Sequence, residues 1–444
     1  KEELDSKDDW VDEAEDFLLK TFGLKLVTRG KKWKSISDEV WRFILFSELV
    51  FDLPCSLPDS LVNIPVANDS TKELIFEICD RLRNDRQTEA LYILKANQVS
   101  NDLALESELK AVTDYGERDT FDFEQRGFLR KYIKAILKQD YDQSRYIEKT
   151  HRNSIWVREG DAQLEWLIAS RAFQLSLSID DFKREFPSAS ANLKDLIQIY
   201  TNKLQVIDQY HRALLQANED LYNRSDMTVT LIESITEKYE NFTSEYIRAF
   251  TSAVSSEKWP PEDLPNNSEV YSKYVDLILK TGNKVAYILV DSLRYELGVE
   301  LKQELENLYN VEINAVSAQL PTITPVGMAS LMPDAHKHLS LVKKSDKLVP
   351  SLNGNIAEDP AGRLKYLKSF LGDRVMDIQL RDLINKGTKL KLDEVIDLIV
   401  IRTTEIDMAG ETEAAFALKE IPNSLQMIRA AIQYLNKSGF ENIV

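Results

Sequence analysis

Hydrophobic residues recur at intervals of three and four positions through the first part of the chain, from Lys1 to about Val254. In the stretch Ala191–Glu219 they stand at Leu193, Leu196, Ile197, Tyr200, Leu204, Ile207, Tyr210 and Leu214. Phe123–Leu137 shows the same spacing, which gathers apolar side chains on one face of an α-helix. We therefore predict a mainly α-helical region over residues 1–254, in one or two subdomains, with its aromatic side chains in the core.

A segment with three prolines, Trp259–Ser268, interrupts this pattern, because proline breaks helices and the Asn and Asp residues beside it favour turns. Beyond it, short apolar runs alternate with helical spacing. The pattern predicts strands over 285–290, 311–317 and 398–401 and from residue 442, and helices over 292–308 and 424–435. Such alternation is typical of an α/β fold in which helices cover both faces of a parallel sheet. We place this domain at 274–444, after a linker and lead-in at 255–273.

Composition narrows the class of protein. A chain of 444 residues with 43% hydrophobic residues is typical of a globular protein of two or three domains. It has no apolar run of about eighteen residues or more, so we expect no membrane association. A net charge of −17 opposes attraction of nucleic acid to the whole surface and leaves only a local cleft for it. Cys55 and Cys79 have neither disulfide nor metal-site spacing, so we expect buried thiols and a cytoplasmic location.

Polar residues follow each of three predicted strands. Asp291 directly follows the first strand, Thr324 follows the second, and Asp407 and Glu411 follow the third. In parallel sheets, ligands bind and functional residues lie in the crevice outside the carboxyl ends of the strands. We therefore expect these side chains to line one cleft. None of the four histidines lies in these segments.

Each of these residues also has a purely structural interpretation. Asp291 suits the N-cap of the predicted helix that follows as well as it suits a metal. Thr324 precedes Pro325, which favours a helical N-cap, and as a nucleophile its hydroxyl would need a nearby cation. Asp407 and Glu411 are four residues apart. On a helix they would share one face, either as a solvated acidic pair or as two ligands of one cation.

Three sequence blocks together resemble the PglZ family, a branch of the alkaline phosphatase superfamily. They are VDSLRYEL at Val290–Leu297, LPTITPVGMASLMP at Leu320–Pro333 and EIDMAGE at Glu405–Glu411. The best-known members belong to BREX bacteriophage-resistance systems. The resemblance has specific motifs over residues 274–444 and extends to the helical region only in general character. It implies an alkaline-phosphatase-like parallel sheet preceded by a mainly α-helical region.

The resemblance also implies roles for five residues. Asp291 matches a metal ligand, Thr324 matches the metal-bound nucleophile that attacks phosphorus in line, and Asp407 matches a ligand of a second metal ion. Glu411 stands where many relatives carry histidine, which gives an oxygen-rich site suited to Mn²⁺ or Mg²⁺ beside Zn²⁺. Arg294 is expected to bind substrate. The complete domain should therefore hold two divalent metal ions.

Relatives carry an Asp-His pair directly after the strand that begins near Asn442, whereas this sequence ends at Val444. The resemblance thus implies a domain truncated at its C-terminal end, and a fragment that is inactive because it lacks the full metal site. The expected function is that of a metal-dependent phosphatase or phosphodiesterase in a BREX-type phage-defence system. Its partners would be other defence proteins, with DNA or a nucleotide as a candidate substrate. The alternatives are a nuclease acting on DNA and a non-catalytic scaffold of the defence complex.

Overall fold

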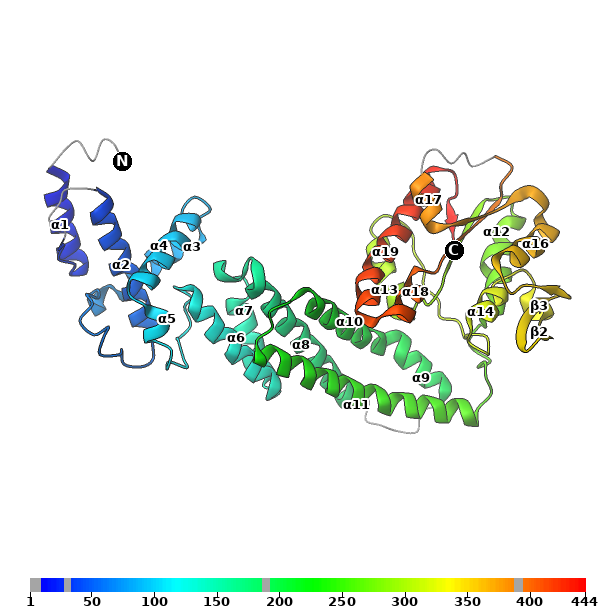
Figure 1. Ribbon diagram of the computed structural model, residues 1–444, viewed down its shortest axis with the longest axis horizontal. Helices are drawn as coiled ribbons and strands as arrows, with labels where there is room; N and C mark the ends of the chain where they lie inside the picture. The colour runs from blue at the N-terminus through cyan, green and yellow to red at the C-terminus, as the bar shows by residue number, and fades with distance from the viewer. Residues whose placement is uncertain (1–8, 28–32, 186–191, 387–393) are drawn as a thin grey trace. The chain divides into compact units, whose positions relative to one another are not determined.

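The computed structural model describes residues 9–27, 33–185, 192–386 and 394–444 (Figure 1). The chain forms two compact units. The first comprises Lys1–Leu177 and Asp220–Thr236, and the second comprises Ser178–Glu219 and Glu237–Val444. All the residues for which the sequence predicts a catalytic, metal-binding or substrate-binding role lie in the second unit. The domain boundaries expected from the sequence stay a prediction.

The first unit is helical, as the hydrophobic spacing predicts. Its elements are α1 (Asp9–Phe22), α2 (Trp33–Asp52), η1 (Asp69–Thr71), α3 (Lys72–Asn84), α4 (Glu89–Asp102), α5 (Leu105–Glu108), α6 (Asp122–Leu137), α7 (Tyr141–His151), η2 (Ile155–Val157) and the first part of α8 (Gly160–Glu185). Helix α6 buries Phe128 and Tyr132, which confirms that these aromatic side chains belong to a core. Cys79 is buried as expected, but Cys55 is exposed because it lies in the loop after α2.

The second unit begins with helices that lead into the α/β fold. They are the end of α8, α9 (Leu193–Ile199), a π-helical turn η3 (Tyr200–Leu204), α10 (Gln205–Asp220), the part of α11 (Asp226–Ser256) from Glu237 onward, η4 (Asn267–Glu269), a second π-helical turn η5 (Tyr271–Val275) and α12 (Asp276–Lys280). The helix predicted over Ala191–Glu219 is confirmed from Leu193 onward, and Ala191 lies outside the described residues. The proline-rich segment before η4 forms turns, as predicted.

A four-stranded sheet with the order β5-β6-β1-β7 organises the rest of this unit. Its strands are β1 (Val285–Val290), β5 (Val375–Gln379), β6 (Leu398–Thr403) and β7 (Asn442–Ile443), and the recorded pairings β5–β6, β6–β1 and β1–β7 are all parallel. Side chains alternate between the two faces of each strand. In β1, Tyr287 and Leu289 enter one core cluster and Ala286 enters another. The predicted α/β class is confirmed.

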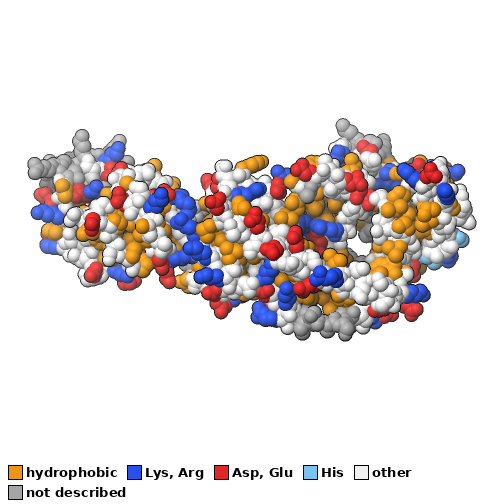
Figure 2. Space-filling view, turned by 60° about the horizontal axis from the view of Figure 1, so that its bottom comes forward, with side chains coloured by type: hydrophobic (Ala, Val, Ile, Leu, Met, Phe, Trp, Pro, Cys, Tyr) orange, Lys and Arg blue, Asp and Glu red, His pale blue; other side chains and the backbone are white. Residues whose placement is uncertain are grey.

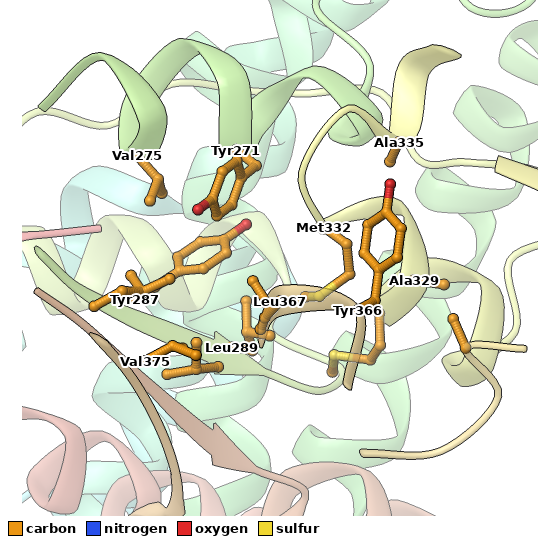
Figure 3. Close-up of a cluster of buried hydrophobic side chains, with 14 of the residues drawn as sticks. Tyr271, Val275, Tyr287, Leu289, Ala329, Met332, Ala335, Tyr366, Leu367 and Val375 are labelled. Atoms are coloured by element: carbon orange, nitrogen blue, oxygen red, sulfur yellow. The ribbon is translucent and has the colours of Figure 1, made fainter. Parts of the chain in front are cut away.

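One face of the sheet is covered by α12, α14 (Thr324–Ser330) and α16 (Pro360–Leu371). Figure 3 shows the core on this side, where Tyr287 projects from β1 toward Tyr271. Their ring centroids are 6.1 Å apart in an edge-to-face arrangement, which aromatic pairs favour. Because aromatic and aliphatic side chains fill this layer, α14 is held firmly beside the end of β1.

The other face is covered by α13 (Tyr295–Leu305), α17 (Leu380–Lys386), α18 (Glu405–Thr412) and α19 (Ala414–Lys437), as Figure 1 shows. Ile399 and Ile401 of β6 pack here against buried residues of α19 such as Leu435. A second cluster joins Leu297 of α13 to Ile406 of α18. The two helices that flank the predicted active-site residues therefore share one core.

Some elements were not predicted from the sequence. A small antiparallel sheet contains β2 (Leu339–Lys344), β3 (Lys347–Leu352) and β4 (Asn355–Ile356). Strand β5 was also missed, as were α15 (Ala335–His338) and η6 (Gly372–Arg374). Throughout the parts of the chain that are described, no helix combines the length and the apolar character needed to cross a membrane.

Two predicted elements differ from the structure. The helix expected from Ser292 begins only at Tyr295, because Ser292 adopts a positive φ of 57° that ends regular structure. Residues 311–317, predicted to form a strand, are extended but join no sheet. Their single ladder contact is an isolated bridge between Asn266 and Ser317. The strand-like sequence therefore lacks a neighbouring strand in the described structure.

A buried ion pair fixes the start of α13 against α10. Arg212 donates from Nη2 to Glu296 Oε2 at 2.9 Å and from Nε to Oε1 at 3.2 Å, and it also pairs with Glu300. The Glu296 side chain is fully buried and that of Arg212 is 6% exposed. Gln209 adds a hydrogen bond to the Glu296 carbonyl oxygen at 3.1 Å. Helix α10 thus belongs physically with the α/β fold.

We expect Arg212→Met to destabilise the second unit by about 3 kcal/mol, because it leaves the buried Glu296 carboxylate without its main partner. The matched control is Arg429→Met, since Arg429 meets Glu304 at 3.4 Å and the two side chains are 40% and 37% exposed. That change should cost less than about 1 kcal/mol. Urea unfolding followed by hydrogen exchange of α13 and β1 measures both. Equal losses for the two variants would contradict the prediction.

Candidate active site

Asp291 lies at the carboxyl end of β1. Its backbone N–H donates to the Thr403 carbonyl oxygen at 3.0 Å, which continues the pairing of β1 with β6 by one residue. The chain then turns at Ser292, and the N-cap position of α13 belongs to Arg294. Asp291 therefore does not cap that helix. Its carboxylate is free for another role.

The environment of Asp291 disfavours a charge. The residue is 9% exposed, and its Oδ2 atom has no hydrogen-bond partner among the residues that the structure describes. Burial raises the pKa of the Asp291 carboxyl above its usual value, and the neighbouring charge of Asp407 raises it further. Hydrogen bonding from the Thr324 hydroxyl and the Ser292 backbone opposes both effects. A buried carboxylate beside a second one is a place where a cation would be stabilised.

Thr324 is the first residue of α14, and its side chain is exposed. The prediction that it caps this helix is wrong by one position, because Ile323 occupies the N-cap and Thr324 already has helical geometry ahead of Pro325. Its hydroxyl is directed instead to the Asp291 carboxylate, whose pKa it lowers. The structure thus brings the predicted nucleophile against the predicted metal ligand.

Asp407 and Glu411 both lie on α18, so the four-residue spacing places them on one face of a helix, as the sequence suggested. Asp407 is half-buried, and its Oδ1 accepts a hydrogen bond from Ser292 Oγ at 2.5 Å. Glu411 is exposed. In the described regions, no hydrogen bond or ion pair joins it to Asp291, Thr324 or Asp407. Ser292 was not predicted to belong to the site. Its hydrogen bond to Asp407 joins the end of β1 to α18, which follows β6.

The arginine that acts on Asp291 is Arg363 of α16. Arg363 is 7% exposed, its positive charge lowers the pKa of Asp291, and its Nη1 donates to the carbonyl oxygen of Glu358 at 3.1 Å. Arg402 of β6 lies near it and forms a bidentate pair with Asp377. Arg402 is marked in the sequence by one feature, which is that it places a charge inside an apolar strand. No local pattern marks Arg363.

Arg294 faces a different part of the unit. Its Nη2 meets Glu296 Oε1 at 2.6 Å, and its side chain lines a cavity formed with η3 and α11. Its expected contact with substrate stays a prediction, as do the metal-binding roles of Asp291, Asp407 and Glu411.

Comparison with known proteins relates part of this sequence to a family. Residues 270–435 match the family described as the BREX system PglZ alkaline phosphatase-like domain. This part of the chain is therefore similar to a PglZ domain. A similar protein is the "Alkaline phosphatase-like protein PglZ" of Bacillus cereus (strain H3081.97), at 25% identity over 96% of this chain. The chain spans about half the length of that curated relative, 49%.

The oxygen atoms of this PglZ-like domain partly fit a divalent metal ion. Asp291, Asp407 and Thr324 offer two carboxylates and a hydroxyl, which are hard ligands suited to Mg²⁺ or Mn²⁺. The unpartnered Oδ2 of Asp291 is the observation that favours a cation here. Over the described residues, however, no group of three or more His, Cys, Asp and Glu side chains has the arrangement of a metal site. If a divalent ion binds here, these residues would supply only part of its ligand set.

The raised pKa of Asp291 has a consequence for stability without metal. A raised pKa means that the folded state binds the proton more tightly than the unfolded state, so this stabilisation is present below the usual value of 3.8 and is lost as pH rises through the folded value. In EDTA we therefore expect Asp291→Asn to raise Tm at about pH 7.5, and by less at about pH 4. Calorimetry measures both, with Asp346→Asn on an exposed turn as the control. A gain that does not depend on pH would contradict this.

Proposed function

We propose that this protein hydrolyses a phosphoric ester with Thr324 as the nucleophile, in a reaction that depends on divalent cations. The observation that supports this best is that the exposed Thr324 hydroxyl lies close enough to the buried Asp291 to lower the pKa of its carboxyl, whose Oδ2 has no partner among the described residues. A hydroxyl nucleophile needs a neighbour that orients it, and Asp291 supplies that. The family description suggests that the protein works as a component of a BREX phage-defence system in the cytoplasm.

In the proposed reaction, Thr324 Oγ1 forms a bond to phosphorus as the bond from phosphorus to the leaving oxygen breaks. The electron pair of the broken bond stays with the leaving oxygen, and the proton of the attacking hydroxyl passes to the Asp291 carboxylate. A water then attacks the phosphorus of the phosphothreonine, which breaks its bond to Oγ1, restores the Thr324 hydroxyl and releases the phosphate. Divalent cations held by Asp291, Asp407 and Thr324, with Glu411 as a further ligand, would stabilise the attacking and leaving oxygens.

Arg363 gives this end of the sheet a positive charge that the sequence did not reveal. A phosphoryl group carries negative charge on its non-bridging oxygens, and a guanidinium with fixed N–H donors suits them. Since Arg363 is held by the Glu358 carbonyl oxygen and is near Asp291, it needs little ordering to bind substrate. We assign it the role of a substrate-binding residue.

A phosphatase or phosphodiesterase fits this surface better than a nuclease. Basic and acidic side chains are interspersed on the face of the molecule drawn in Figure 2, and the net charge is −17. A nuclease would need a positive face for the phosphates of DNA. The alternative of a non-catalytic scaffold, with other defence proteins as partners, is separated from an enzyme by the two measurements below.

The first measurement is binding of metal ions. We expect MnCl₂ to raise the Tm of the chain, because a ligand that binds only the folded state stabilises it by about 2.7 kcal/mol at a hundred times its Kd. Asp291→Asn and Asp407→Asn should each abolish most of this shift, whereas Asp346→Asn should retain it. A shift that is unchanged in Asp291→Asn would place the cation elsewhere and contradict the proposed site.

The second measurement is hydrolysis of p-nitrophenyl phosphate and bis-p-nitrophenyl phosphate by the protein that contains this chain. We expect Thr324→Ala to lower the rate at least about 10³-fold, because loss of a nucleophile removes the covalent step. Thr322→Ala is the matched control, since Thr322 is an exposed threonine two residues away. The preferred ester separates a phosphatase from a phosphodiesterase. Equal rates in the two variants, or no metal-dependent hydrolysis at all, would favour the scaffold.

A further inference from the structure

The segment Val311–Val316 is an extended chain that lacks a strand neighbour. Exposure alternates from residue to residue along it, as it does in a β-strand with one covered face. Across the described structure, none of its backbone N–H or C=O groups is hydrogen-bonded to another segment. Unpaired backbone groups on an extended chain are a template for another strand. This part of the molecule therefore offers a row of unused hydrogen bonds.

The backbone hydrogen bonds of Ser317 indicate which edge of the segment has no neighbour among the described residues. Its N–H donates to the Pro265 carbonyl oxygen at 2.7 Å, and its carbonyl oxygen accepts from Asn267 N–H at 2.9 Å. Successive residues of an extended chain point these groups to opposite edges. Glu312, Asn314 and Val316 therefore present theirs to the edge away from the Pro265–Asn267 segment. Among the described residues, no backbone group is hydrogen-bonded to that edge.

Beside the segment lies a cavity of about 620 Å³ whose wall includes several aromatic side chains. The wall includes Tyr200 of η3, Tyr246 and Phe250 of α11, Trp259, and Tyr295 of α13. The polar groups of three of these are already used. Tyr200 donates to Asp208 at 2.7 Å, Tyr246 donates to the Leu196 carbonyl oxygen at 2.7 Å, and Trp259 Nε1 donates to the Ala318 carbonyl oxygen at 3.1 Å. What they present to the cavity is therefore apolar ring surface.

A positive charge lies at the same cavity. The Arg294 side chain is 55% exposed, and its partner Glu296 is already held by two hydrogen bonds from Arg212. The charge of Glu296 is thus compensated from the buried side. Arg294 can pair with a ligand carboxylate without leaving Glu296 uncompensated.

We propose that residues 311–316 and this cavity bind an extended segment of another polypeptide by β-strand addition. The main chain of that segment pairs with Glu312, Asn314 and Val316, one large aromatic or aliphatic side chain enters the cavity, and an acidic residue meets Arg294. In this mode, main-chain hydrogen bonds supply affinity and the pocket supplies specificity. A small aromatic acid would fill the cavity too, but it would leave the row of backbone groups unused. This proposal does not depend on the proposed hydrolysis.

The probe is a fluorescein-labelled synthetic peptide of alternating Val and Thr that carries one Trp and one Asp. Fluorescence anisotropy measures its binding to the full chain, and hydrogen exchange follows the amides of residues 312, 314 and 316. We expect binding together with slower exchange at these amides. The same peptide with N-methylated alternate amides keeps its side chains but loses its donors, so it should bind at least about tenfold more weakly.

A matched pair of variants tests the same edge on the protein. Asn314→Pro removes the N–H that should pair with the peptide, whereas Asn314→Ala keeps it, and the structure shows no partner for that N–H whose loss would disturb the fold. We expect binding to weaken at least about tenfold in Asn314→Pro and to stay within about twofold in Asn314→Ala. Indole-3-acetate serves as the small-molecule probe.

Three outcomes would overturn the proposal. One is equal binding of the peptide and its N-methylated form, which needs no variant and so does not depend on folding. Another is tight binding of indole-3-acetate that the peptide cannot displace, since that would make the cavity a small-molecule site. The third is the absence of peptide binding with residues 312–316 already protected from exchange in the chain alone.

Discussion

The parallel pairing of β1 with β6 is the constraint on which the candidate active site depends. Their register runs from Val285 opposite Leu398 to Val290 opposite Thr403, so both strands end at the same level of the sheet. Asp291 extends β1 by one residue, and α18 begins two residues after Thr403. Because both strands are buried on both faces, a slip of one residue would exchange the side chains of the two cores. The hydrophobic pattern thus fixes where the carboxylates meet.

Placing two carboxylates at one strand end has a thermodynamic cost. Burial and the charge of Asp407 both disfavour the ionised Asp291, and the compensation comes from Ser292, the Thr324 hydroxyl and the positive charge of Arg363. None of these gives Oδ2 a hydrogen-bond partner. Such strain is common where a site is organised for a ligand rather than for stability. The local electrostatics therefore mark the corner of the domain where the sequence motifs predict a site.

The sequence predicted those features that depend on local pattern. The apolar run Val285–Val290 predicted a strand at the observed bounds, and the resemblance to PglZ proteins predicted that Asp291 and Asp407 belong to one site. The start of α13 could not be predicted, because a positive φ at Ser292 is set by the contacts of this one turn. Arg363 was missed for a different reason. It comes to Asp291 through the packing of α16 on the sheet, which no short motif encodes.

The error at residues 311–317 is the most informative, because the pattern itself was correct. The segment is extended and alternates in exposure, yet a strand exists only where another strand accepts its hydrogen bonds. The turn between Asp291 and Tyr295 lies between this segment and the active site, and Arg212 holds it through Glu296. Leu293, Arg294 and Tyr295 all line the cavity, and the buried pair of Arg212 with Glu296 fixes the first turn of α13 beside them. The two sites are therefore adjacent in sequence but separately supported.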